Sequence, residues 1–319
     1  MSDFAVYRAG DIRRLLDFRS CTAVVRKAMA ALSADAREQP LRSITTIREG
    51  RLFALMPGMS TGEPGFGAKL ISVFRDPTKG GRSMHRGLVA LFEETTGSVV
   101  CVADAHEITR IRTACASAVA TDALARANAS SLAIFGCGTQ AESHLRALRL
   151  VRNFSEVVIW GRSAAIAQDF AARMADDTGL NVRAEADAAT AAQADVICTV
   201  TAAAEPVLMC DWVRPGTHVN AVGSSHAGPV EIDPQLVAAS LYFVDYRPSA
   251  LAAAAEFIRA KELGLVDDNH IRAEIGEVLN GTKAGRTEKD QVTLYKSLGH
   301  IAQDLAATRL VHDRATGPA

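Results

Sequence analysis

Short β-branched runs alternate with alanine-rich helical segments from about Thr113 onward. The runs that read as strands are residues 132–135, 157–160, 195–200, 218–222 and 242–244. Strands separated by helical segments are typical of βαβ units, whose parallel strands are buried by helices on both faces. This part of the chain is therefore predicted to form a parallel, doubly wound α/β sheet.

A glycine motif directly follows the first of these strands. It reads Gly136-Cys137-Gly138-Thr139-Gln140-Ala141 and leads into a segment of helical character. In a dinucleotide fold the first glycine permits a tight turn, the second lets the backbone approach a pyrophosphate, and the small third residue allows close helix packing. The N–H groups at the helix N-terminus then bind the phosphates. The motif predicts a dinucleotide site, and a purely structural glycine turn is the alternative.

The residues after the second strand bear on which dinucleotide binds. An NAD site usually places an acidic residue there to accept a hydrogen bond from the ribose 2′-hydroxyl, whereas this sequence has Gly161-Arg162-Ser163. A guanidinium and a hydroxyl favour a 2′-phosphate, so NADPH is preferred over NADH. Both cofactors stay open, because a guanidinium can also stack on the adenine of either one. An arginine that contacts only solvent is the alternative.

The first hundred residues have a different pattern. Apolar residues at helical spacing over residues 10–34 predict one or two amphipathic helices. A largely antiparallel sheet is predicted from strands at residues 41–47, 51–56, 69–74, 88–92 and 99–102. This part is therefore expected to be an α+β domain. Residues 293–310 are predicted to form a helix that returns to it.

Charge and composition exclude several classes of function. The chain has 319 residues, a length that predicts about two domains, and 35 basic against 36 acidic side chains give a net charge of −1. Such a chain has no electrostatic excess for nucleic acid or a membrane surface, and neither is expected as a partner. It also lacks a signal-like leader and any apolar run of about 18 residues, so we expect a soluble cytoplasmic protein.

The six cysteines lie far apart, without a CxxC pair or a histidine at metal-ligand spacing. They are expected to be reduced core residues, and no metal site is expected. Cys137 lies inside the glycine motif, where we interpret it as a small residue tolerated in a tight turn.

Motifs spread over nearly the whole chain resemble the ornithine cyclodeaminase/μ-crystallin family. They are Pro40-Leu41-Arg42, Met56-Pro57, Gly67-Ala68-Lys69, Ile108-Thr109, Arg112-Thr113-Ala114, the glycine motif, Ala194-Asp195-Val196-Ile197, Glu205-Pro206, the run from Gly216 to Gly223, Glu274-Ile275-Gly276-Glu277-Val278 and Lys296-Ser297-Leu298-Gly299. The resemblance implies a Rossmann-type parallel-sheet domain inserted into an α+β domain that binds substrate and dimerises. We expect residues 1–118 and 300–319 to form the latter, residues 119–299 to form the dinucleotide domain, and the protein to be a homodimer.

The resemblance also implies roles for individual residues. Arg42, Lys69 and Arg112 match the family cations around the substrate's carboxylate and imino nitrogen, and Lys69 is the candidate catalytic proton donor. Arg112 is expected at the start of a helix over residues 113–127, where an anion is favoured. The residues expected to bind the cofactor are His85, Arg112, Thr113, Gly136, Gly138, Thr139, Gln140, Gly161, Arg162, Ser163, Val200, Thr201, Val222, Gly223, Ser224 and Gly299. For His85, a structural histidine is the alternative.

One position departs from the cyclodeaminases and shapes the functional hypothesis. Their loop after the strand ending Asn-Ala-Val-Gly carries an aspartate that assists attack by the substrate's side-chain amine, but here Ser225 takes that position. A serine is a poor general base without an activating partner. The resemblance is therefore to the reductases of the family, which reduce a C=N bond next to a carboxylate with NADPH or NADH.

The expected substrate is a small 2-imino acid, which gives an L-amino acid. The candidates are Δ1-pyrroline-2-carboxylate, Δ1-piperideine-2-carboxylate and iminosuccinate. The second carboxylate of iminosuccinate would need another cation, and His226, Arg48 and Arg86 are candidates that are otherwise solvated or structural residues. A cyclodeaminase with bound NAD and a non-enzymatic NADPH-binding protein of the μ-crystallin type remain the alternatives.

Overall fold

The computed structural model describes residues 4–76, 82–224 and 228–317, without the side chains of residues 75–76 and 82–85. The chain divides into two compact units. Unit 1 consists of Met1–Arg112 and His300–Ala319, and unit 2 is the continuous segment Thr113–Gly299. Helix α3 (Ala105–Leu124) begins in unit 1 and continues into unit 2. Among the described residues, no helix is both long and apolar enough to cross a membrane.

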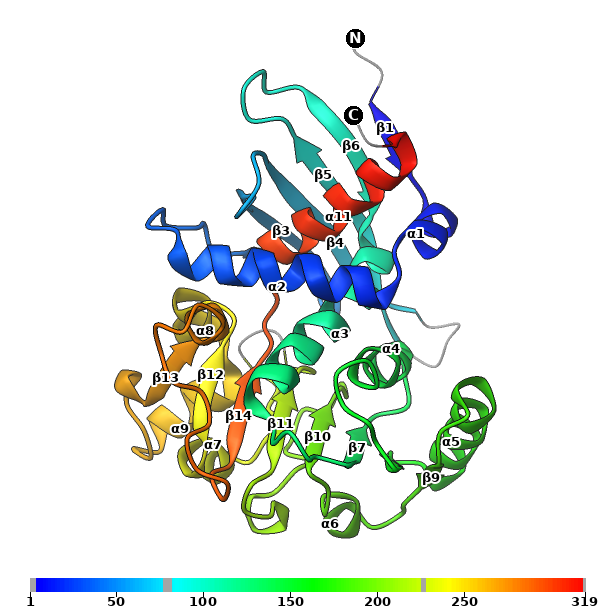
Figure 1. Ribbon diagram of the computed structural model, residues 1–319, viewed down its shortest axis with the longest axis vertical. Helices are drawn as coiled ribbons and strands as arrows, with labels where there is room; N and C mark the ends of the chain where they lie inside the picture. The colour runs from blue at the N-terminus through cyan, green and yellow to red at the C-terminus, as the bar shows by residue number, and fades with distance from the viewer. Residues whose placement is uncertain (1–3, 77–81, 225–227, 318–319) are drawn as a thin grey trace. The chain divides into compact units, whose positions relative to one another are not determined.

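Unit 1 contains a six-stranded sheet in the order β1-β6-β5-β4-β3-β2 (Figure 1). All neighbouring strands are antiparallel except β1 and β6, which are parallel. The strands are β1 (Ala5–Tyr7), β2 (Ser43–Arg48), β3 (Arg51–Met59), β4 (Phe66–Asp76), β5 (Arg82–Phe92) and β6 (Val99–Asp104). The predicted antiparallel sheet is thus confirmed. β1 is an additional strand that was not predicted, because three residues are too few to show the pattern of a strand.

Helices cover one face of this sheet. The predicted helical region 10–34 forms α1 (Ala9–Leu15) and α2 (Phe18–Ala34). α2 buries Cys21, Val25, Met29 and Leu32, which recur at helical spacing. The C-terminal helix α11 (Ile301–Thr316) packs beside α2 and against β3, β4 and β5 (Figure 1).

Unit 2 contains an eight-stranded, all-parallel sheet in the order β13-β12-β14-β11-β10-β7-β8-β9. Its strands are β7 (Ser131–Phe135), β8 (Glu156–Trp160), β9 (Val182–Ala184), β10 (Val196–Thr199), β11 (His218–Ala221), β12 (Leu241–Val244), β13 (Ile271–Glu274) and β14 (Thr293–Lys296). Its remaining helices are α4 (Thr139–Leu148), α5 (Ala164–Thr178), α6 (Ala188–Ala191), α7 (Pro234–Ala239), α8 (Arg247–Ala253), α9 (Ala255–Glu262) and α10 (Ile275–Leu279).

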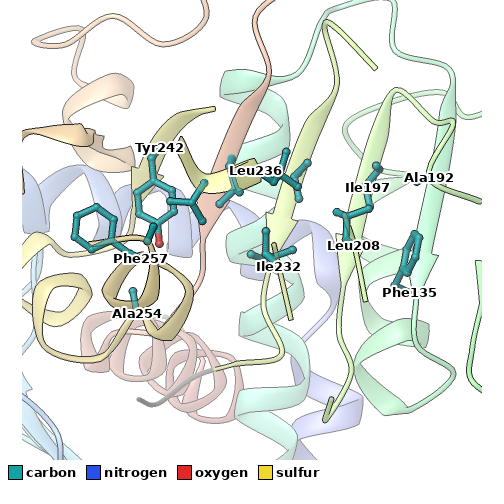
Figure 2. Packing of buried hydrophobic residues seen from close by; sticks show 14 of the residues in the cluster. Phe135, Ala192, Ile197, Leu208, Ile232, Leu236, Tyr242, Ala254 and Phe257 are labelled. Carbon is teal, nitrogen blue, oxygen red and sulfur yellow. The ribbon is translucent and has the colours of Figure 1, made fainter. Parts of the chain in front are cut away.

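The strand order reverses between β7 and β10, since β8 and β9 extend the sheet on one side of β7 and the later strands extend it on the other. Ligands of such sheets bind beyond the carboxyl ends of the strands at this reversal. The sheet is held by a buried apolar cluster that includes Phe135, Ile197, Leu236 and Tyr242 (Figure 2). The predicted parallel α/β fold is confirmed.

Asp195 ties the amino ends of β7 and β10 together. Its carboxylate accepts the backbone N–H groups of Ser130 and Ser131 at 2.8 and 3.1 Å, and it pairs with Arg126 at 2.5 Å. These contacts lower the pKa of Asp195 despite the opposing effect of burial, because they favour the ionised form.

Two predicted helices have different limits. Residues 293–310 are not one helix: Thr293–Lys296 forms β14, and α11 begins only at Ile301. Thr293, Leu294 and Tyr295 pair with both β11 and β12, and Gly299 then turns the chain at a φ of 80°. The helix predicted at 113–127 is α3, which begins eight residues earlier, at Ala105. Arg112 therefore lies inside a helix and not at its N-terminus.

Candidate active site

A buried carboxylate in unit 1 holds two cations that are distant in the sequence. Asp304, on α11, lies 2.8 Å from Nζ of Lys69 on β4 and 2.9 Å from Nε of Arg112 on α3. Arg112 also donates from Nη1 to Oε1 of Gln303 at 2.8 Å. Asp304, Lys69 and Arg112 are 0, 1 and 4% exposed. We call Asp304, Lys69, Arg112 and Gln303 the Asp304 cluster.

Two glycines let α11 approach the sheet closely enough to form this cluster. Gly58 on β3 and Gly67 on β4 are partners in the strand register. A Cβ on Gly58 would lie 2.4 Å from the side chain of Ile301, and one on Gly67 would lie 2.8 Å from that of Leu305 and 2.1 Å from a backbone oxygen. Both distances to the helix are too short for a real Cβ atom. Because these two glycines have no side chains, the first turns of α11 can pack directly against β3 and β4.

The environment of Lys69 brings its pKa down to about 7. Burial is the main cause, because it penalises the charged form, and the positive charges of Arg112 and Arg42 act in the same direction. Asp304 opposes them by stabilising the ammonium. Lys69 is consequently poised to gain or lose a proton near neutral pH, which is the property that a general acid or base requires.

Arg42 lies half-buried near this cluster, and its charge also acts on the neighbouring His300. Burial and the charges of the three cations, opposed by Asp304, together lower the pKa of His300 to about 3, so the imidazole is neutral. Nδ1 of His300 accepts the N–H of Ala302 at 3.2 Å and thereby caps α11. The structure therefore places Arg42, Lys69 and Arg112 close enough for all three charges to act on His300.

The glycine motif in unit 2 forms the turn between β7 and α4. Gly136 has a φ of 134°, and its missing Cβ would lie 3.0 Å from Val200. Gly138 is the N-cap of α4 and offers no capping side chain, so the first N–H groups of the helix are available to an anion. A Cβ on Gly138 would meet no described atom within 4 Å, which leaves this side of the turn open to a ligand.

The loop after β8 consists of the three residues between this strand and α5. Gly161 approaches Cys137, whose Sγ would lie 2.7 Å from a Cβ at this position. Arg162 is exposed. Ser163 caps α5 by accepting the N–H of Ile166 at 3.4 Å, so its hydroxyl already has a structural role.

The remaining candidate cofactor residues follow neighbouring strands of the same sheet. Val200 and Thr201 come directly after β10, and Val222, Gly223 and Ser224 come after β11. Gly299 follows β14 and donates its N–H to Asp245 at 2.5 Å. In a parallel sheet these carboxyl ends lie along one edge.

Several polar atoms at these positions suit a dinucleotide. Oγ1 of Thr113, Oε1 of Gln140 and Oγ of Ser224 are buried and have no hydrogen-bond partner in the described part of the chain. Buried polar groups are usually satisfied, so such atoms indicate a ligand that would pair with them. Together with the uncapped end of α4, they fit the hydroxyl, amide and phosphate groups of a nicotinamide dinucleotide.

Three candidate side chains fall outside the described part of the chain. The side chain of His85, on β5, lies outside the described residues, as do Ser225 and His226. Sequence reasoning also missed Asp304, Gln303 and a second buried acid, Glu231. A signal for Asp304 exists, because it falls at helical spacing among the buried residues Ile301, Leu305 and Thr308.

We expect Asp304→Asn to lower the free energy of unfolding by about 3–5 kcal/mol, because it leaves two buried cations without their carboxylate. Urea unfolding measures the change. The control is Asp313→Asn, which makes the same substitution at an exposed position of the same helix and should leave stability nearly unchanged. Equal stability of the two variants would contradict the role given to Asp304.

Comparison with known proteins gives matches over most of the chain. Mouse ketimine reductase mu-crystallin is 36% identical over 276 residues, which cover 86% of this chain and 84% of that protein. A Delta(1)-pyrroline-2-carboxylate reductase of Bacillus cereus is 30% identical over 313 residues, which cover 97% of this chain and 96% of that protein.

Solved structures also match almost the whole chain. Thermococcus litoralis Delta(1)-pyrroline-2-carboxylate reductase, in complex with NADH and L-proline, has a TM-score of 0.93 at 28% identity and covers 98% of both chains. An archaeal alanine dehydrogenase dimer with bound NAD has 0.92 at 28% identity, covering 98% of this chain and 96% of that one. The iminosuccinate reductase of Paracoccus denitrificans, in complex with NAD+, has 0.90 at 27%, with the same coverage.

The family model agrees with these individual matches. It covers residues 3–318, and therefore includes both the Asp304 cluster and the glycine turn. The chain belongs to the ornithine cyclodeaminase/mu-crystallin family.

Proposed function

We propose that the protein uses NADH or NADPH to reduce the C=N bond of a small 2-imino acid to an L-amino acid. Unit 1 binds the substrate, and unit 2 binds the dinucleotide. The observation that carries the proposal is the buried Lys69, whose pKa is about 7 and which is held by Asp304 among other cations.

The charges around Lys69 suit an anionic substrate. With Lys69 protonated, Asp304 pairs with two cations while the charge of Arg42 also acts on Lys69, so an incoming carboxylate offsets part of the excess positive charge. Arg112 and Arg42 are proposed to bind that carboxylate, because a guanidinium binds both oxygens at once. Nε2 of Gln303 has no acceptor among the described residues, and it supplies a further donor.

Lys69 is proposed to donate a proton to the imine nitrogen during reduction. Asp304 keeps the ammonium oriented, and burial keeps its pKa near 7. Bound NADH or NADPH supplies the hydride for the imine carbon. In the reverse direction, neutral Lys69 accepts the proton from the amine.

The relatives support this assignment and its substrate class. They include reductases named for pyrroline-2-carboxylate, ketimines and iminosuccinate. Ser225 stands where the cyclodeaminases carry an acid, which argues against cyclising deamination. Arg162, in the loop after β8, favours NADPH as the preferred cofactor.

We expect the protein to oxidise NADH or NADPH with at least one of pyrroline-2-carboxylate, piperideine-2-carboxylate and iminosuccinate generated in the assay. Lys69→Met should lower kcat by about 10²–10⁴, because it removes the proton donor. The control, Lys261→Met, replaces a lysine of α9 that pairs with exposed Asp268 and should retain the wild-type rate. Thermal melting checks that both variants fold.

Other outcomes of this assay would contradict the proposal. Ammonia release from L-ornithine without added cofactor would identify a cyclodeaminase. Tight binding of NADPH without turnover of any imino acid would indicate a binding protein. Wild-type kcat in Lys69→Met would exclude Lys69 as the proton donor.

The pH dependence should have opposite signs in the two directions. Because reduction needs protonated Lys69, its kcat is expected to fall as the pH rises through about 7, whereas oxidation of the product should rise there. Arg42→Gln removes a positive charge that lowers the pKa of Lys69, so the inflection should move to higher pH. The control, Arg37→Gln, removes an exposed arginine paired with Asp35 and should leave it in place. Parallel pH profiles in the two directions would contradict this role of Lys69.

We further propose that unit 1 forms a homodimer through the sheet face opposite to α11. Leu55, Leu70 and Leu88 are aligned across three strands on that face. Phe53, Phe74 and Leu88 are 39, 40 and 38% exposed. An exposed apolar surface of neighbouring side chains is typical of a protein interface, and the archaeal alanine dehydrogenase is described as a dimer.

Light scattering is expected to give twice the 33.8 kDa of the chain for the wild type. Leu88→Asp should give the mass of one chain, because it places a charge within the apolar face. Leu251→Asp provides the control, since Leu251 is 37% exposed but lies on α8 in unit 2. A Leu88→Asp dimer as stable as the control would contradict this interface.

A further inference from the structure

Glu231 lies buried between the loops that follow β10 and β11. Its Oε1 accepts the backbone N–H of Thr201 at 2.5 Å, and its Oε2 accepts that of Gly223 at 2.6 Å. The residue is 0% exposed. A Cβ on Gly223 would lie 2.3 Å from Oε2 of Glu231, so this glycine is what gives the carboxylate room. One side chain thus sets the spacing of two loops.

Glu231 is bound by a second buried acid, Glu256, which in turn pairs with Lys296. Glu256, on α9, accepts the backbone N–H of Glu231 at 3.4 Å and lies 2.9 Å from Nζ of Lys296 on β14. Glu256 and Lys296 are 1 and 0% exposed. Burial raises the pKa of Glu231, and the charge of Glu256 acts in the same direction, whereas the hydrogen bonds to Thr201 and the positive charge of Lys296 favour the ionised form.

The two loops lie at the part of the sheet where the nicotinamide half of a dinucleotide is expected. The strand order reverses between β7 and β10. In folds of this kind, each half of the sheet binds one mononucleotide. The turn after β7 and the loop after β8 belong to the adenosine half, whereas Thr201 and Gly223 follow the first two strands of the other half.

We propose that Glu231 is a positioning residue that sets the distance between the loops bearing Thr201 and Gly223, and thereby the placement of the nicotinamide ring. This inference rests on the proposed cofactor. Glu231 acts through the backbone N–H groups that it binds. Its loss should therefore affect the nicotinamide half of the cofactor selectively and leave the adenosine half in place.

The test compares two ligands on the full-length protein. NADH contains both halves, whereas ADP-ribose lacks the nicotinamide. Glu231→Gln keeps the shape of the side chain but loses one of its two acceptors. We expect the Kd for NADH, measured by calorimetry, to rise about tenfold, the loss expected for a hydrogen bond to a charged group. The Kd for ADP-ribose should stay within about twofold.

The kinetic readout separates positioning from affinity. At saturating NADH, kcat should still be lower in Glu231→Gln, because a misplaced ring reacts more slowly even when it is bound. The KM for the imino acid should stay near its wild-type value. Glu231→Asp keeps the charge but shortens the reach by one methylene, so it should show the same selective loss if Glu231→Gln does not fold.

Asp195→Asn is the matched control, because Asp195 also joins two segments through backbone N–H groups, but at the amino ends of the strands. It should lower the melting temperature without changing the ratio of the two Kd values. Equal weakening of NADH and ADP-ribose by the Glu231 variants, or no weakening of either, would overturn the positioning role. Failure of the wild type to bind either NADH or NADPH would instead contradict the proposed function.

Discussion

The ion pairs of Asp304 are the contacts on which the chemistry of unit 1 depends. Lys69 and Arg112 come from a strand and a helix far apart in the sequence, and two positive charges repel each other unless a carboxylate lies between them. Burial makes this compensation obligatory, because neither cation can turn to water. The same burial brings the pKa of Lys69 close to neutrality. One carboxylate thus permits both the approach of the two cations and the tuning of one of them.

In unit 2, two carboxylates instead bind backbone N–H groups. Asp195, which directly precedes β10, binds N–H groups at the amino end of the neighbouring strand β7, whereas Glu231 binds N–H groups beyond the carboxyl ends of β10 and β11. A charged acceptor makes stronger hydrogen bonds than a neutral one and fixes the donors at short distances. The first contact supports the sheet, while the second lies at the edge where ligands of parallel sheets bind.

Local patterns were sufficient for the predicted parallel sheet and its glycine turn, because alternating strands and helices and a Gly-x-Gly turn are written in contiguous residues. The strand at Thr293 was mistaken for part of a helix, because only its pairing with β11 and β12 distinguishes a strand of four residues. Asp304 and Glu231 escaped sequence reasoning for a related reason. Each acts on residues that only the folded chain brings near, and an isolated acidic side chain in a sequence normally signifies an exposed one.

The discontinuity of unit 1 has a consequence for the order of folding during synthesis. Unit 2 is one continuous segment, whereas α11 is translated only after all of it. The ribosome therefore releases Lys69, Arg112 and the two glycines of β3 and β4 well before Asp304 can contact them. β14, which lies between β12 and β11 in the sheet of unit 2, ends only eight residues before Asp304, so the sheet and the cationic site are both completed at the end of the chain. The site acquires its acid–base properties in the last stage of synthesis.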